Sequence, residues 1–104
     1  IASKLAKLRV FSDEAGKMNL DIASVHQEIL LISQFTLVAE VSGGNRPSFT
    51  KAAAPQRARD LYENLAERLA ALDQKVKTGF FGEYMIIETA LDGPITITLD
   101  SKSL

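Results

Sequence analysis

The segment at 55–72 constrains the fold most, because its pattern predicts a long amphipathic helix. Pro55 suits the first turn of a helix, where its missing N–H would have no partner. Apolar residues then recur at spacings of three and four, which places them on one face. This stripe comprises Ala58, Leu61, Tyr62, Leu65, Leu69 and Leu72. A helix of this kind must bury its stripe against another layer of structure.

Other segments indicate that this second layer is a β-sheet. The continuous apolar run within 28–39 is typical of a strand buried on both faces. The remaining expected elements are a helix at 1–9, a turn at 13–17, and strands at 18–20, 75–78, 84–91 and 95–99, the last two forming a hairpin. We therefore expect an α/β fold, a mixed β-sheet with packed helices, in a single domain.

The composition excludes several kinds of site. The chain of 104 residues has no cysteine, so it has no thiolate nucleophile, disulfide or Cys-based zinc site. A single histidine, His26, cannot form a histidine cluster, and we expect no metal and no cofactor. The absence of cysteine fits a reducing compartment, so we expect a cytoplasmic protein.

Charge and hydropathy limit the kinds of partner that the protein can bind. No apolar run approaches ~18 residues, so we expect neither a membrane span nor a membrane partner. The net charge is −1, so any contact with nucleic acid needs a local basic patch. The basic residues around the middle of the chain are equally consistent with phosphate contacts and with a solvated surface: Arg46, Lys51, Arg57 and Arg59.

Two short polar runs predict the site. Residues 33–37 place hydroxyls and an amide inside the most apolar segment, where an unpaired polar group costs roughly 1–3 kcal/mol. Residues 92–96 place Gly93-Pro94 before an alternating strand, and a Gly-Pro step can adopt a cis peptide bond. These features indicate a site built from backbone and neutral polar groups. Each also has an ordinary interpretation, as polar groups paired between strands and as a turn with a trans bond.

Four runs together resemble the D-aminoacyl-tRNA deacylases, also called D-tyrosyl-tRNA deacylases. They are SQFTL at 33–37, NRPSF at 45–49, TGFFGEYM at 78–85 and DGPIT at 92–96. The resemblance spans nearly the whole chain. It departs from the family pattern at Leu91, where the family has Asn, and at Glu83-Tyr84, where the family has Ala-Asp.

The resemblance also bears on how the chain begins. The helical pattern starts at Ile1 without a capping residue, and the family has two further strands before this position. We therefore expect residues 1–104 to be roughly the C-terminal two-thirds of a deacylase domain.

The resemblance implies an activity and an assembly. Members of the family hydrolyse the ester between a D-amino acid and the 3′-terminal adenosine of tRNA, accept glycyl-tRNA and spare L-aminoacyl-tRNA. In the family the Gly-Pro bond is cis and enters the active site of the other subunit of a homodimer. Carried over, Gly93 and Pro94 are the chiral gate, whose carbonyls would accept hydrogen bonds from the substrate ammonium and exclude an L side chain.

The same resemblance assigns the remaining site residues. Gln34, Phe35 and Thr36 are the catalytic candidates, with backbone N–H groups binding the developing oxyanion. Thr36 is the candidate nucleophile or water-positioning group. We favour attack by water helped by the terminal ribose hydroxyl, because no base adjoins Thr36 in the sequence. Ser33, Phe81, Gly82 and Met85 are the further substrate-binding candidates, although Phe81 and Met85 also suit a core.

Two other functions remain open from the sequence. The chain could be an editing module like the N-terminal domain of archaeal threonyl-tRNA synthetases. It could also be a catalytically silent interaction protein on the same scaffold, which Leu91 in place of Asn would favour.

Overall fold

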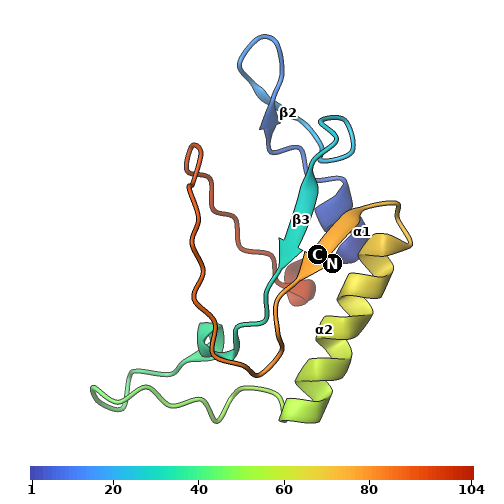
Figure 1. Cartoon of the computed structure of the whole chain (residues 1–104). Helices are drawn as coiled ribbons and strands as arrows, with labels where there is room; N and C mark the ends of the chain where they lie inside the picture. The colour runs from blue at the N-terminus through green and yellow to red at the C-terminus, as the bar shows by residue number, and fades with distance from the viewer.

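A computed structural model describes residues 1–104 of the chain. Its elements in chain order are α1 (Ala2–Ala6), β1 (Phe11–Ser12), β2 (Met18–Leu20), β3 (Glu28–Leu31), the 3₁₀ helix η1 (Phe35–Val38), α2 (Pro55–Ala70), β4 (Lys75–Thr78) and the 3₁₀ helix η2 (Ser101–Ser103). Figure 1 shows α2 lying against β4, with α1 at the upper end of α2. The α/β class expected from the sequence is confirmed.

The centre of the fold is the unit formed by β3, α2 and β4. The two strands are parallel and pair Glu28 with Lys75 through to Leu31 with Thr78. Parallel neighbours need a crossover connection, which α2 provides. The Lys77 ammonium lies 3.0 Å from a Glu28 carboxylate oxygen across the pair, and its hydrogen bond lowers the pKa of Glu28. Because the strands are parallel, their carboxyl ends lie at the same edge of this small sheet.

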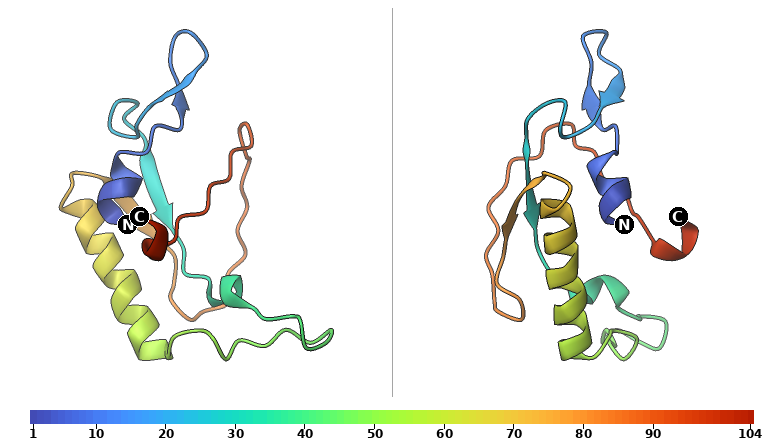
Figure 2. Two further views of the ribbon diagram at one scale, coloured as in Figure 1. Left: turned by 180° about the vertical axis from the view of Figure 1, so that it is seen from behind. Right: turned by 90° about the vertical axis from the view of Figure 1, so that its right-hand side faces the viewer.

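A second sheet is the antiparallel hairpin of β1 and β2, which projects away from the rest of the molecule (Figure 2). The turn expected at 13–17 is present. One Asp13 carboxylate oxygen accepts hydrogen bonds from the N–H groups of Ala15 and Lys17, each at 2.9 Å. Gly16 has φ +74°, a conformation that glycine adopts without penalty.

The stripe of α2 is buried along only part of its length. Leu69 is fully buried and Ala58, Tyr62 and Leu65 are half-buried, but Leu61 is 51% exposed. The helix ends at Ala70, two residues before the predicted end. Only Ala2, Ala6 and Ile22 join Leu69 in the buried core. The helix has 16 residues with many charged positions, and none of the helices could cross a membrane.

The prediction of one buried strand over 28–39 is wrong beyond Leu31. The strand stops there, and residues 35–38 form η1, with Phe35 60% and Leu37 85% exposed. The last bond of the ladder runs from the Gly79 N–H to the Leu31 carbonyl at 3.0 Å, and this carbonyl also accepts from the Tyr62 hydroxyl at 2.9 Å. The ladder therefore ends where β4 ends.

The predicted hairpin of strands at 84–91 and 95–99 is also not formed. The chain does reverse direction between these two arms (Figure 1), but no backbone hydrogen bond joins them. Their apolar residues stay exposed, with Ile86 at 81% and Leu91 at 72%. Alternation of apolar and polar residues marks extended backbone, but a strand also needs a partner, and this chain places none beside these arms.

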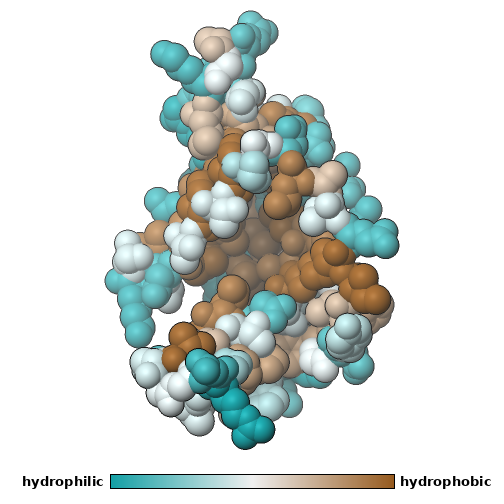
Figure 3. All heavy atoms as spheres, turned by 90° about the vertical axis from the view of Figure 1, so that its left-hand side faces the viewer, coloured by the Kyte–Doolittle hydropathy of each residue, from teal (hydrophilic) through white to brown (hydrophobic).

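Much apolar surface therefore remains open. The accessible surface is 8668 Å², whereas a compact protein of 11.3 kDa exposes about 5,700 Å². The radius of gyration is 15.8 Å, against about 13 Å for a compact domain of this length. Figure 3 shows apolar side chains gathered in a hollow on one face. A surface of this kind is typical of one that another segment or chain covers.

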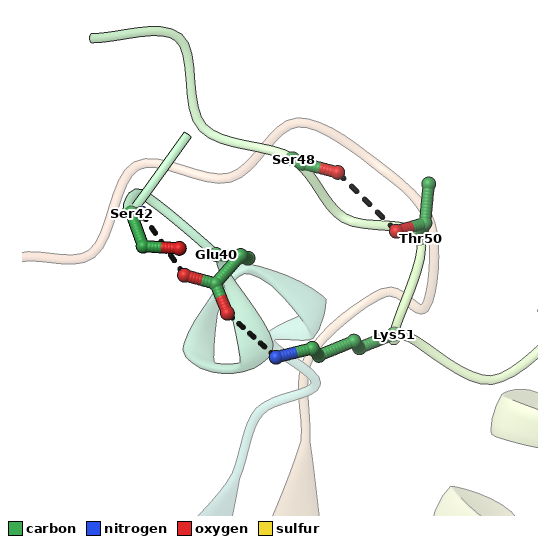
Figure 4. A network of polar contacts seen from close by, with 5 residues as sticks. All are labelled: Glu40, Ser42, Ser48, Thr50 and Lys51. Carbon is green, nitrogen blue, oxygen red and sulfur yellow. Dashed lines mark hydrogen bonds and ion pairs between the residues drawn. The ribbon is translucent and has the colours of Figure 1, made fainter. Parts of the chain in front are cut away.

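The loop between η1 and α2 is closed at its base by Glu40. The backbones of Glu40 and Ser48 exchange two hydrogen bonds, at 2.8 and 2.9 Å. The Glu40 carboxylate accepts from the Lys51 ammonium at 2.6 Å and from the Ser42 N–H at 3.0 Å (Figure 4). The hydrogen bond from Lys51 is the main cause that lowers the pKa of Glu40 to about 2.

We expect Leu69→Ala to lower the free energy of unfolding by about 2–5 kcal/mol, because it leaves a cavity under α2. Leu61→Ala, on the same helix at an exposed position, is the matched control and should cost about 0.5 kcal/mol or less. Urea denaturation followed by circular dichroism measures both. Equal losses for the two variants would contradict the buried position of Leu69.

We expect the Glu40 carboxylate to titrate near pH 2, well below the usual value of 4.5. Since the pKa is depressed in the folded state, the Lys51 contact stabilises the loop above pH 4.5 and is lost as the pH falls toward 2. Carbon-detected NMR titration of the side chain measures the midpoint. In Lys51→Met the midpoint should move up toward 4.5, and an unchanged midpoint would show that Lys51 is not the cause.

Candidate functional site

Two of the segments singled out in the sequence leave the same sheet edge. Residues 32–34 follow β3 and residues 79–85 follow β4. The Leu31 carbonyl joins them, since its two hydrogen bonds come from Gly79 and from Tyr62 of α2. A Cβ on Gly79 would lie 2.8 Å from the Met85 sulfur and 3.8 Å from Ile32 Cγ1, so the two segments pack closely here. The carboxyl ends of parallel strands are where α/β proteins commonly bind ligands.

The three catalytic candidates lie at the start of the 3₁₀ helix η1, with Gln34 as its N-cap and Phe35 and Thr36 as its first two residues. The Gln34 side-chain amide donates to the Thr36 hydroxyl at 2.5 Å, and the Phe35 ring meets the Phe49 ring edge-to-face at 5.0 Å. The strand alternation that would separate Gln34 and Thr36 from Phe35 is absent, because residues 35–38 are helical. All three side chains are exposed, while Ser33 is half-buried.

Backbone donors are available in the same place. The N–H groups of Gln34, Phe35 and Thr36 make no hydrogen bond within the chain. The Thr36 hydroxyl accepts from Gln34 and keeps its own proton to donate. No carboxylate, histidine or lysine contacts this hydroxyl, so it has no base to activate it as a nucleophile. The arrangement can therefore hold an oxygen or a water molecule more readily than it can attack a carbonyl carbon.

The loop at 79–85 holds a second group of candidates. The Phe81 ring packs on the Tyr62 ring at 5.7 Å, and the Arg59 guanidinium lies over Phe81 at 4.8 Å from the ring centre. The Met85 sulfur accepts the Phe80 N–H at 3.4 Å, so Met85 closes the loop from within. Phe81 and Met85 are half-buried and Gly82 is exposed. Phe80 is 73% exposed and takes no part in this packing.

The two groups are not in contact with each other. No hydrogen bond or ring contact joins η1 to residues 80–85, and the right-hand view of Figure 2 shows η1 apart from the turn that follows β4. The structure thus places the two segments at one edge of the sheet and joins their far ends by no hydrogen bond or ring contact.

The third candidate segment lies elsewhere. The Gly93-Pro94 bond is cis, as expected, and both residues are exposed. They sit beside a groove of about 560 Å³ lined by Leu8, Val10, Phe11, Ser12, Asp92, Gly93, Ile95 and Ile97. Within one chain, Gly93 and Pro94 are brought together neither with η1 nor with Phe81.

Sequence reasoning missed the neighbours of Phe81. Tyr62 lies in the apolar stripe of α2, as the sequence predicts, and its hydroxyl bond to the Leu31 carbonyl is a contact that the stripe does not predict. The available signal was the spacing of Arg59 and Tyr62, three residues apart on one helix, which places both side chains toward the same neighbour. For metals, the structure contains no group of three or more His, Asp or Glu side chains able to share an ion.

Comparison with known proteins identifies the family. Residues 1–100 match the family model described as D-Tyr-tRNA(Tyr) deacylase. The D-aminoacyl-tRNA deacylase of Deinococcus radiodurans is 53% identical over 100 residues, which cover 96% of this chain and 69% of the relative. That of Thermomicrobium roseum is 51% identical over 104 residues, covering 100% of this chain and 68% of the relative.

A solved structure agrees with these relatives. The protein called c-Myc DNA Unwinding Element Binding Protein is 38% identical and superposes with a TM-score of 0.84, covering 96% of this chain and 68% of that chain. With a family model matched over residues 1–100 and relatives at about half identity, the chain belongs to the D-Tyr-tRNA(Tyr) deacylase family.

Proposed function

We propose that this protein hydrolyses the ester bond of D-aminoacyl-tRNA and of glycyl-tRNA, releasing the free amino acid and tRNA. The observation that carries this proposal is the match to the deacylase family over residues 1–100, together with relatives named D-aminoacyl-tRNA deacylase. The reaction is a proofreading step of translation. Ester hydrolysis requires a stabilised oxyanion, a positioned water and a route for the water proton to the leaving ribose oxygen, which the neighbouring ribose hydroxyl of the tRNA provides. A cytoplasmic location fits, since charged tRNA is found there.

The backbone N–H groups at the start of η1 are the groups that polarise the ester carbonyl. As water attacks, the ester carbonyl oxygen gains negative charge, which the N–H groups of Gln34, Phe35 and Thr36 can stabilise because they have no other partner. The Thr36 hydroxyl, oriented by Gln34, positions the water. The terminal ribose hydroxyl of the tRNA assists the proton transfer, and Ser33 completes this wall of the site.

The opposite wall holds the adenosine. Phe81, Gly82 and Met85 follow β4 at the same sheet edge at which residues 33–36 follow β3, so a nucleoside bound on the loop lies near the catalytic candidates. Phe81 and Met85 present apolar surface. Gly82 has φ +79°, and a Cβ added there would meet nothing within 4 Å, so the backbone is open to a ligand at this point.

Gly93 and Pro94 of a second subunit distinguish D-aminoacyl from L-aminoacyl substrates. Within one chain these residues lie far from η1 and are exposed, as expected of a segment that enters another copy. The mostly apolar groove beside Gly93 supports a homodimer, because it gives a second copy a face to contact where the gate lies. The Gly93 and Pro94 carbonyls then accept hydrogen bonds from the substrate ammonium and fill the space that an L side chain needs.

We expect the protein to hydrolyse D-Tyr-tRNA and to leave L-Tyr-tRNA intact. Thr36→Ala should lower kcat by about tenfold at most, the scale of one lost hydrogen bond, while Thr36→Ser retains the hydroxyl and most activity. Loss of a true nucleophile lowers kcat far more, by about 10⁴-fold or above. Single-turnover hydrolysis of labelled aminoacyl-tRNA measures these rates.

The outcomes of that assay separate the alternatives. Hydrolysis of L-Ser-tRNA in place of D-Tyr-tRNA would identify a synthetase-type editing module, and hydrolysis of neither substrate would identify a silent interaction protein. A loss near 10⁴-fold in folded Thr36→Ala would restore the nucleophile model.

We expect Gly93→Ala to lower the preference for D over L substrates by at least about tenfold. Gly93 has φ +124°, where a side chain is strained by about 1–3 kcal/mol, and a Cβ would lie 3.1 Å from the Ile95 nitrogen. The backbone must then shift and move the carbonyls of the gate. The ratio of D-Tyr-tRNA to L-Tyr-tRNA hydrolysis measures the effect.

Gly16→Ala is the matched control. Gly16 also has a positive φ, of +74°, but lies in the hairpin turn with nothing within 4 Å, so its substitution should leave the preference unchanged. Sedimentation equilibrium at the assay concentration completes the test. A monomer that discriminates fully would contradict a gate supplied by the partner subunit.

A further inference from the structure

The Arg59 side chain is held over an aromatic ring beside the proposed adenosine wall. Its guanidinium carbon lies 4.8 Å from the centre of the Phe81 ring, within the range of a cation–π contact. Phe81 is in turn fixed by Tyr62, whose hydroxyl bonds to the Leu31 carbonyl at 2.9 Å. A chain of contacts from Arg59 through Phe81 and Tyr62 to the end of β3 therefore holds the Arg59 side chain in place.

The charge of Arg59 is not matched by a close carboxylate. Its nearest acidic partner is Glu63, with 3.9 Å between Nη1 and Oε1, and the two side chains are 47% and 57% exposed. No hydrogen bond uses any of its five N–H donors. Lys51 and Lys77, by contrast, contact carboxylates at 2.6 and 3.0 Å. A positioned cation with free donors is suited to an anionic ligand.

Helix geometry distinguishes Arg59 from its neighbour Arg57. Each residue turns the helix by about 100°, so Arg57 lies about 160° away from Arg59 around α2 and points to a different side. Arg59 lies about 60° from Tyr62 and shares its face, which is the face toward the loop at 79–85. Of the two arginines in the first turns of α2, Arg59 is the one placed beside the site.

We propose that Arg59 binds the 5′-phosphate of the terminal adenosine of the substrate. This inference rests on the proposed function, because it assumes that the adenosine lies against the loop at 79–85. In a nucleotide the ribose separates the phosphate from the base. A cation at the edge of the loop that binds the base is therefore close enough to contact the 5′-phosphate. The planar guanidinium can give a phosphate two parallel hydrogen bonds while Phe81 supports one of its faces.

The test compares Arg59→Gln and Arg59→Lys with Arg68→Gln. Arg68 lies about 13 Å further along α2, on the opposite side, where it bonds to Asn64 at 2.8 Å. Arg59→Gln should raise the KM for D-aminoacyl-tRNA about tenfold with little change in kcat, the scale of one charge-assisted contact. Arg59→Lys should show a smaller rise, and Arg68→Gln none.

Two further readouts separate phosphate binding from a structural role. The dependence of log KM on log salt concentration should become shallower by about 0.7 in Arg59→Gln, the contribution of one phosphate on a single strand. Adenosine 5′-monophosphate should inhibit the unsubstituted protein more strongly than adenosine does, and Arg59→Gln should remove this difference.

The inference is overturned if both probes inhibit the unsubstituted protein equally, or if Arg59→Gln keeps the preference for the monophosphate. An equal weakening of adenosine and adenosine 5′-monophosphate in Arg59→Gln also overturns it, since that pattern means Arg59 only supports Phe81. Failure of the unsubstituted protein to hydrolyse D-aminoacyl-tRNA contradicts the proposed function instead, so the two failures are distinct.

Discussion

The Leu31 carbonyl is the point on which the arrangement of the site depends. It accepts one hydrogen bond from the Gly79 N–H and one from the Tyr62 hydroxyl, and so joins the end of β3 to the end of β4 and to α2. A carbonyl oxygen has two lone pairs, and both are used here. Because neither segment continues as a strand, this junction and the close packing of Gly79 on Ile32 set how the two segments lie relative to each other.

The electrostatic character of the site follows from the residues gathered there. The candidates at the start of η1 are neutral, and the N–H groups of residues 34–36 make no hydrogen bond within the chain. Charged pairs lie outside η1, as Glu40 with Lys51 at the base of the neighbouring loop and Glu28 with Lys77 on the sheet. A site of this kind binds its ligand by fixed dipoles, whose energies grow when bound substrate excludes water.

The sequence predicted the local elements well where a local signal determines them. The helical stripe located α2 to within two residues at its end, Asp13 and Gly16 marked the hairpin turn, and residues 18–20 and 75–78 are strands as expected. The motifs also identified the family and the cis Gly93-Pro94 bond. These features depend on neighbouring residues, which a linear pattern records.

The prediction failed where distant partners decide the outcome. The apolar run after Leu31 has the pattern of a strand, but its pairing with β4 ends at Leu31 and Thr78, and residues 35–38 form η1 instead. The motifs gave the order of Gln34, Phe81 and Gly93 along the chain but not their positions in space. The spacing of Arg59 and Tyr62 on α2 shows that they share a neighbour, but it does not show that this neighbour is Phe81, because that contact comes from the packing of the helix on a distant loop.

The unpaired arms at 84–91 and 95–99 have a consequence for the behaviour of the chain in solution. Their N–H and C=O groups form open edges, and the sequence Ile95-Thr96-Ile97-Thr98-Leu99 has no charge or proline to discourage pairing with another strand. Such an edge forms intermolecular β-sheet when nothing covers it. The arms at 84–91 and 95–99 are therefore positions at which a further strand can add to the fold.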